Sequence, residues 1–223
     1  MKNIINIAVV GLGQVGIYLL NELNLKKKDI QIKTGKKINI VAVSAKNINK
    51  KRQFKFDKKN FFKNPLDILN KKKVDILFEV IGQSDGISKK IVEAALKNKT
   101  HVITPNKALI SKHGNDLAKL AEKNNVNLEF EASVAGGIPV LRSIKEGLAT
   151  NKISKVYGIL NGTSNYILSN MEKIKMDFET VLKKAKELGY AENNPKSDLN
   201  GEDVKSKIQI LSSLAFNCFI NKS

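Results

Sequence analysis

The chain has little of what secreted and membrane proteins use. Its 223 residues include one cysteine, Cys218, and no tryptophan. One cysteine excludes an internal disulfide and agrees with a reducing compartment. No apolar run approaches the ~20 residues that a helix needs to span a bilayer, and the N-terminus lacks the layout of a signal peptide. These absences predict a soluble, cytoplasmic protein with no membrane partner.

Arginine and aromatic residues are also scarce, which bears on the meaning of the positive charge. The formal net charge is +18, yet the arginines are Arg52 and Arg142, and aromatics make up 6% of the chain. Base recognition favours arginine, and single-stranded nucleic acids stack on aromatic side chains. The lysines are spread over several segments, a pattern typical of solvated surface charge. We therefore expect no nucleic-acid partner.

Six residues after the first apolar run form the most informative motif. The run Ile4–Val10 is followed by the pattern GxGxxG and then by an apolar-periodic helix. This context is typical of a dinucleotide-binding turn, in which the first glycine permits the turn, the second lets a pyrophosphate approach and the third lets helix and strand pack closely. The alternative is a glycine-rich turn that binds nothing. The residues expected to contact a cofactor are Gly11, Leu12, Gly13, Gln14, Val15 and Gly16.

The end of the second expected strand bears on which dinucleotide is bound. An NAD site would carry a carboxylate there for the ribose 2′-hydroxyl. The sequence instead has Ser44 and Lys46, followed by the basic residues 50–52, which suit a 2′-phosphate. NADP is therefore favoured, with NAD as the other possibility. Gly82, after a later strand, is expected beside the cofactor at the same edge of the sheet.

Strand and helix patterns alternate along the first part of the chain. Strands are expected at 4–10, 37–43, 74–81, 100–104 and 126–131. Helices are expected at 14–25, 65–69, 88–98 and 114–124, with a lysine-rich loop before residue 37 and an irregular segment at 46–64. This alternation predicts a doubly wound, mostly parallel, Rossmann-type sheet over residues 1–135.

Residues 136–223 are expected to form a second, α+β domain that binds substrate. The expected elements are a helix opened by residues 136–139 and ending near 149, a strand at 153–160, and helices at 165–171, 178–188 and 201–216.

Four later segments, together with the GxGxxG turn, resemble homoserine dehydrogenase. They are Thr-Pro-Asn-Lys-Ala at 104–108, Phe-Glu-Ala-Ser-Val-Ala-Gly-Gly-Ile-Pro at 130–139, Gly-Ile-Leu-Asn-Gly-Thr-Ser-Asn-Tyr at 158–166, and residues 189–207. Their order and spacing match the family. Gln83 stands where the family often has a second glycine and Pro105 where it often has alanine, and neither change removes a reactive group. Family members continue past residue 216, so the second domain is expected to be incomplete.

The resemblance implies reversible, NAD(P)H-dependent reduction of L-aspartate 4-semialdehyde to L-homoserine, on the route to threonine, methionine and isoleucine. A lysine ammonium of ordinary pKa, about 10.4, is a competent proton donor to the alkoxide that forms. By match to the family, Lys207 is the donor, Lys107 polarises the carbonyl and contacts the cofactor, and Asp203 orients Lys207. Asp203 and Lys207 are four residues apart on one expected helix, so they share a face.

The resemblance also implies the small-molecule ligands and the assembly. Glu192, Asp198, Thr163 and Tyr190 match substrate-site positions, although Thr163 could instead cap the helix that follows it. A site for a monovalent cation such as sodium matches Glu131, Val134, Gly136 and Ile138. The complete protein is expected to be a homodimer. The alternative function is a truncated, inactive module that binds NADP without turnover.

Overall fold

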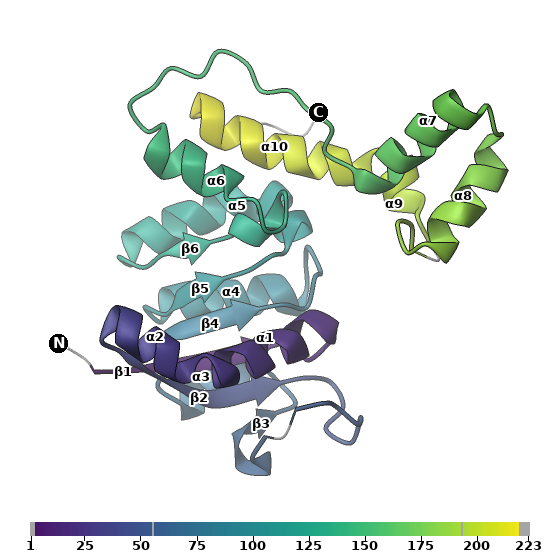
Figure 1. Cartoon of the computed structure of the whole chain (residues 1–223). Coiled ribbons are helices and arrows are strands. Elements are labelled where there is room, and N and C mark those ends of the chain that lie inside the picture. The colour runs from purple at the N-terminus through teal and green to yellow at the C-terminus, as the bar shows by residue number, and fades with distance from the viewer. Residues whose placement is uncertain (1–2, 55, 193, 219–223) are drawn as a thin grey trace. The chain divides into compact units, whose positions relative to one another are not determined.

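The computed structural model describes residues 3–54, 56–192 and 194–218 (Figure 1). The chain divides into two compact units, Met1–Gly136 and Gly137–Ser223. No helix in the described part of the chain is long and apolar enough to cross a bilayer.

The first unit is built on a six-stranded sheet in which every neighbouring pair is parallel. The strand order is β3-β2-β1-β4-β5-β6. The chain therefore winds outward from β1 in one direction and then from β4 in the other, and the doubly wound Rossmann-type prediction is confirmed. The strands are β1 (Ile4–Val10), β2 (Lys37–Ser44), β3 (Phe61–Phe62), β4 (Ile76–Glu79), β5 (His101–Ile103) and β6 (Leu128–Glu129).

Helices cover both faces of this sheet because right-handed crossovers in opposite directions place their helices on opposite sides. Figure 1 shows α1 and α2 on one face and α4 and α5 on the other. The helices are α1 (Gln14–Leu25), α2 (Lys27–Thr34), α3 (Leu66–Lys71), α4 (Ile87–Lys97) and α5 (Lys107–Lys123), with short 3-10 turns η1 (Lys58–Asn60) and η2 (Glu131–Ser133).

The covering of both faces explains why the second half of β1, residues 7–10, is continuously apolar and buried. Ala8 and Val9 point to opposite faces, and both are fully buried. Ile7 and Val9 form one core cluster with Leu20 of α1 and Val43 of β2. The carboxyl end of β1, where the GxGxxG turn begins, is therefore anchored in a hydrophobic core.

Three expectations for the first unit are wrong in detail. The lysine-rich loop before residue 37 contains α2, which is followed by Gly35 in the left-handed conformation with φ +68°. Helix α5 starts at Lys107 rather than near residue 114, because Asn106 caps it by accepting from the Leu109 N–H at 3.1 Å. The irregular segment 46–64 contains the two-residue edge strand β3, which pairs with the end of β2.

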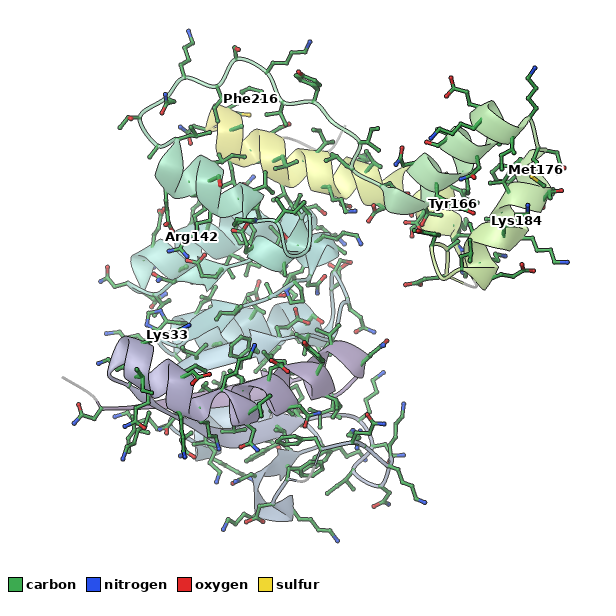
Figure 2. The ribbon with its side chains drawn as sticks, in the orientation of Figure 1. Lys33, Arg142, Tyr166, Met176, Lys184 and Phe216 are labelled. Atoms are coloured by element: carbon green, nitrogen blue, oxygen red, sulfur yellow. The ribbon has the colours of Figure 1, made fainter. Side chains whose placement is uncertain are left out.

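The described residues of the second unit form helices and connecting segments, and no strand. Its helices are α6 (Val140–Arg142), the π-helix η3 (Ser143–Gly147), α7 (Gly162–Ile174), α8 (Phe178–Glu187), α9 (Lys196–Leu199) and α10 (Glu202–Phe216). Ile167 of α7 packs against Val181 and Ala185 of α8 in a small core. Figure 2 labels Tyr166 on α7, Lys184 on α8 and Met176 in the turn between them, with the Lys184 Nζ atom 3.5 Å from the Met176 sulfur.

The strand expected at 153–160 is wrong. Residues 152–160 carry no strand, and Tyr157 and Ile159 are 83% and 77% exposed. A strand requires a neighbour to pair with its backbone N–H and C=O groups, and the described residues of this unit provide no other strand. Residues 153–160 therefore have no strand to pair with among the described residues of this unit, and the α+β expectation for the unit depended on that strand.

Candidate functional site

The GxGxxG turn is shaped by lack of space at two of its three glycines. Gly11 has φ +105°, and a Cβ atom placed there would lie 2.6 Å from the Val80 carbonyl oxygen. A Cβ on Gly16 would lie 2.0 Å from the Gly11 carbonyl oxygen. A Cβ on Gly13 would meet no atom within 4 Å. The outer glycines are therefore required by packing, whereas Gly13 faces open space.

The turn is fixed between the ends of β2 and β4. The Gly11 N–H donates to the Ser44 carbonyl at 2.9 Å, and the Val80 N–H donates to the Val10 carbonyl at 2.8 Å. This is the point at which the strand order reverses, where open parallel sheets bind their ligands. Gly13 precedes α1 and has no side chain to cap the first N–H groups of the helix, so these donors suit an anion.

The remaining residues of the expected cofactor set surround this turn. Leu12 is buried, whereas Gln14, Val15, Lys46 and Gly82 are exposed. Ser44 is 2% exposed.

Arg52 holds the loop that follows β2. Its guanidinium donates to the carbonyls of Asn47 at 2.7 Å and of Lys50 at 2.9 Å. The basic residues 50–52 are expected from the sequence to suit a 2′-phosphate. Some of their hydrogen-bond donors, those of Arg52, instead bind backbone carbonyls of the loop.

A second polar cluster, in the second unit, is centred on Asn161. Its Nδ2 atom donates to Oδ1 of Asp198 and to Oδ2 of Asp203, both at 2.8 Å. Its Oδ1 atom accepts from the Ser164 N–H at 2.7 Å and so caps α7. Asn161 and Asp203 are 5% and 4% exposed. One buried amide therefore fixes two carboxylates and the start of a helix.

Lys207 lies in the same cluster, one turn after Asp203 on α10. Its Nζ atom is 2.8 Å from the Leu160 carbonyl oxygen and 2.8 Å from Oδ2 of Asp203. Its side chain is 20% exposed. The structure pairs the two residues, as their spacing predicts, and the low exposure distinguishes Lys207 from the many solvated lysines of the chain.

Thr163 and Tyr190 meet in this cluster through the backbone. The Thr163 hydroxyl donates to the Tyr190 carbonyl at 2.6 Å and lies 3.2 Å from Oδ2 of Asp198. Asn161, and not Thr163, caps α7. The Tyr190 ring stacks on Tyr166 with centroids 4.5 Å apart. Glu192, in the loop before α9, is exposed.

The sequence-predicted residues are divided between the two units. Lys107, the first residue of α5, belongs to the first unit, whereas Asp203 and Lys207 belong to the second. The expected cation ligands are also divided. Glu131, Val134 and Gly136 end the first unit, and Ile138 begins the second. Among the described residues no group of three or more His, Cys, Asp or Glu side chains is arranged to hold a metal.

The sequence motifs assign no individual role to two buried polar residues. Asn161 lies within the motif at 158–166, and an asparagine directly before a helix is a cap signal. Glu79, the last residue of β4, is fully buried. A charged residue at the end of an apolar strand was the available signal for it.

Comparison with known families decides which proteins this chain is related to. Residues 11–131 match the model of the homoserine dehydrogenase NAD-binding domain, and residues 139–223 match the model named homoserine dehydrogenase. The chain belongs to the homoserine dehydrogenase family. The resemblance read from its motifs is confirmed.

Relatives of known sequence and structure agree with this assignment. The homoserine dehydrogenases of Neisseria gonorrhoeae and Bacillus subtilis are 42% and 38% identical over 98% and 96% of the chain, which covers 50% and 49% of those proteins. A Staphylococcus aureus homoserine dehydrogenase structure has a TM-score of 0.84 at 42% identity, covering 99% of this chain and 55% of that one. A Thiobacillus denitrificans homoserine dehydrogenase structure gives 0.87 at 35% identity, with 99% and 51% covered. The chain thus spans about half the length of the curated relatives it matches.

Proposed function

We propose that this chain carries the cofactor-binding and substrate-binding residues of a homoserine dehydrogenase that reduces L-aspartate 4-semialdehyde to L-homoserine, a step in the synthesis of threonine, methionine and isoleucine. The observation that carries the proposal is the buried cluster around Lys207, found in a chain whose first unit has a dinucleotide-type turn. Family membership supports the pairing of these two features in one enzyme.

The first unit is proposed to bind a nicotinamide dinucleotide. The open space at Gly13 and the N–H groups of α1 fit a pyrophosphate, and the crowding at Gly11 and Gly16 keeps that turn in place. The bound nicotinamide would supply the hydride. NADP is favoured over NAD because Ser44 and Lys46, and no carboxylate, lie at the end of β2.

Lys207 is proposed to give a proton to the substrate oxygen. A lysine ammonium has three donors, and the contacts with Leu160 and Asp203 use two of them. The third is left for the oxygen that becomes the hydroxyl of homoserine. Asp203 holds the ammonium in place, and Lys107 is proposed to polarise the same carbonyl from the start of α5.

The carboxylates that precede α10 are proposed to bind the α-ammonium group of the substrate. Asp198 is held by Asn161 and Thr163, and Glu192 is exposed in the neighbouring loop. Tyr190 is proposed to line the same site. We further propose that backbone carbonyls at Val134, Gly136 and Ile138, with Glu131, hold a monovalent cation such as sodium. The complete protein is proposed to be a cytoplasmic homodimer.

A cofactor titration and a turnover assay on the same sample test this proposal. The wild-type chain is titrated with NADPH, and NADPH oxidation is then followed at 340 nm with L-aspartate 4-semialdehyde. Saturable binding with substrate-dependent oxidation supports the enzyme. Failure to bind either NADPH or NADH contradicts it.

The second candidate function is a module that binds NADP without turnover. The observation that favours it is the coverage of about half of each relative. Binding without oxidation, in an assay where a full-length family member is active, selects this candidate.

A further inference from the structure

Glu79 makes an unusual set of contacts for a carboxylate with no exposed surface. Its Oε1 atom accepts from the backbone N–H groups of Ile81 at 2.9 Å and Gly82 at 3.3 Å. Its Oε2 atom accepts from the Thr104 hydroxyl at 2.6 Å and the Asn106 amide at 3.2 Å. One side chain therefore joins the loop after β4 to the corner after β5.

Both joined segments lie at the carboxyl edge of the sheet. The loop begins at Val80, whose carbonyl oxygen is the atom that a Cβ on Gly11 would strike. The loop is thus in contact with the GxGxxG turn. The corner leads into α5, because Asn106 caps that helix and also donates to the Gln83 carbonyl at 2.8 Å. Lys107 is the next residue.

The place of these segments in the sheet indicates which half of a dinucleotide they would meet. In a doubly wound sheet the adenosine ribose lies at the end of the second strand, here β2. The dinucleotide then crosses the switch point, so its nicotinamide half lies on the β4 side. A carboxylate that fixes the backbone of the loop after β4 therefore affects the part of the site where the nicotinamide half would bind.

We propose that Glu79 is a positioning residue for the nicotinamide half of the cofactor, because it fixes the Ile81–Gly82 loop and the Asn106 corner against each other. The proposal rests on the dinucleotide site proposed above. Glu79 itself, with no exposed surface, does not touch the cofactor. Its effect passes through the N–H groups and the helix start that it holds.

The four contacts make glutamine a sharp test of this role. Every partner of Glu79 donates to it, so the side chain must accept at both ends. In Glu79→Gln the amide NH2 replaces one of the two oxygens and faces donors at whichever end it lies. The size of the side chain is unchanged while one of the two joined segments is released.

The experiment compares two ligands by calorimetric titration. NADPH spans both halves of the site, whereas adenosine 2′,5′-bisphosphate is the NADP fragment without nicotinamide. We expect Glu79→Gln to weaken NADPH binding about tenfold and to change binding of the fragment less than about twofold. A general loss of structure would weaken both ligands alike. Equal weakening of both, or no weakening of either, overturns the proposal.

Two further variants keep the test decisive should Glu79→Gln fold poorly. Thr104→Val removes one donor to Oε2 at nearly constant volume, and we expect about threefold weaker NADPH binding with the fragment unaffected. Thr100→Val is the matched control, because the Thr100 hydroxyl is equally buried and donates to the Val74 carbonyl before β5 begins. It should change neither affinity. Wild-type protein that binds neither ligand overturns the proposed function itself.

Discussion

The two units build their candidate sites from different parts of the chain. In the first unit, backbone atoms form the turn, and Gly11 and Gly16 are required because there is no space for a side chain at either position. In the second unit, buried side chains make the cluster, with Asn161, Asp203 and Lys207 holding one another. We therefore expect the glycine turn of the first unit to be disrupted when a side chain is added. We expect the cluster of the second unit to be disrupted when a side chain is removed.

The largest effect is expected where a reacting group is removed from the side-chain site. Lys207→Ala should lower kcat by about 10²- to 10⁴-fold because the proposed proton donor is lost, while NADPH affinity stays within about twofold. Lys205→Ala is the matched control, since Lys205 is an exposed lysine of the same helix. Steady-state assays with aspartate semialdehyde measure both. Turnover at the wild-type rate in the Lys207 variant would remove this residue from the mechanism.

The next effect tests the backbone site by adding one methyl group. Gly16→Ala should lower the free energy of unfolding by about 3 kcal/mol, because the new Cβ would overlap the Gly11 carbonyl. Gly13→Ala should change stability by less than about 0.5 kcal/mol, since that position is open, yet it should weaken NADPH binding. Urea unfolding and NADPH titration provide the two readouts. The two variants behaving alike in unfolding would refute the steric distinction between these glycines.

A smaller effect is expected when the centre of the side-chain cluster is removed but Lys207 is kept. Asn161→Ala deprives Asp198 and Asp203 of a shared donor, which should cost about 1 to 3 kcal/mol of stability and raise the KM for aspartate semialdehyde. Asn165→Ala, at an exposed position of α7, is the control. Indistinguishable unfolding curves for the two variants would mean that the Asn161 contacts contribute little.

The smallest effect concerns an exposed ion pair near the β4 loop. Hydrogen bonds from Lys112, Ser84 and His113 hold the pKa of the Asp85 carboxyl well below its usual value. A lowered folded-state pKa stabilises the fold above the unfolded value of about 3.9, and this contribution is lost as the pH falls below about 4. At pH 7 the Asp85→Asn variant should therefore have a slightly lower free energy of unfolding than the wild-type chain. This difference, measured by urea unfolding, should shrink towards pH 2. A difference that grows on acidification would contradict this sign.

The sheet could be predicted from the sequence because its signals are local. The apolar runs of β1 and β2 and the start of α1 are set by neighbours in the chain, and Gly11 and Gly16 are crowded as their spacing implies. Helix α2 could not be predicted because its sequence is rich in lysine and has only a weak apolar face. The start of α5 is not visible in the apolar pattern, because it depends on the cap, Asn106, which directly follows Pro105.

The polar cluster of the second unit could be predicted only in part. The spacing of Asp203 and Lys207 places them on one face, and the structure pairs them. The central role of Asn161 depends on Asp198 and Asp203, 37 and 42 residues further on, which no local pattern connects. The segment 153–160 shows the opposite case, in which a strand-like sequence has no partner among the described residues. Local patterns predict what a segment can form, whereas its partners decide what it does form.

Hydride transfer itself is the most direct test of the proposed chemistry. The wild-type chain is incubated with NADPH deuterated at both C4 positions and with L-aspartate 4-semialdehyde, and the homoserine formed is analysed by mass spectrometry. The account predicts homoserine one mass unit heavier, with the deuterium on C4, and an initial rate of labelled product that is at least about 100-fold lower for the Lys207→Ala variant. Formation of unlabelled homoserine, or equal initial rates of labelled product from both proteins, would contradict it.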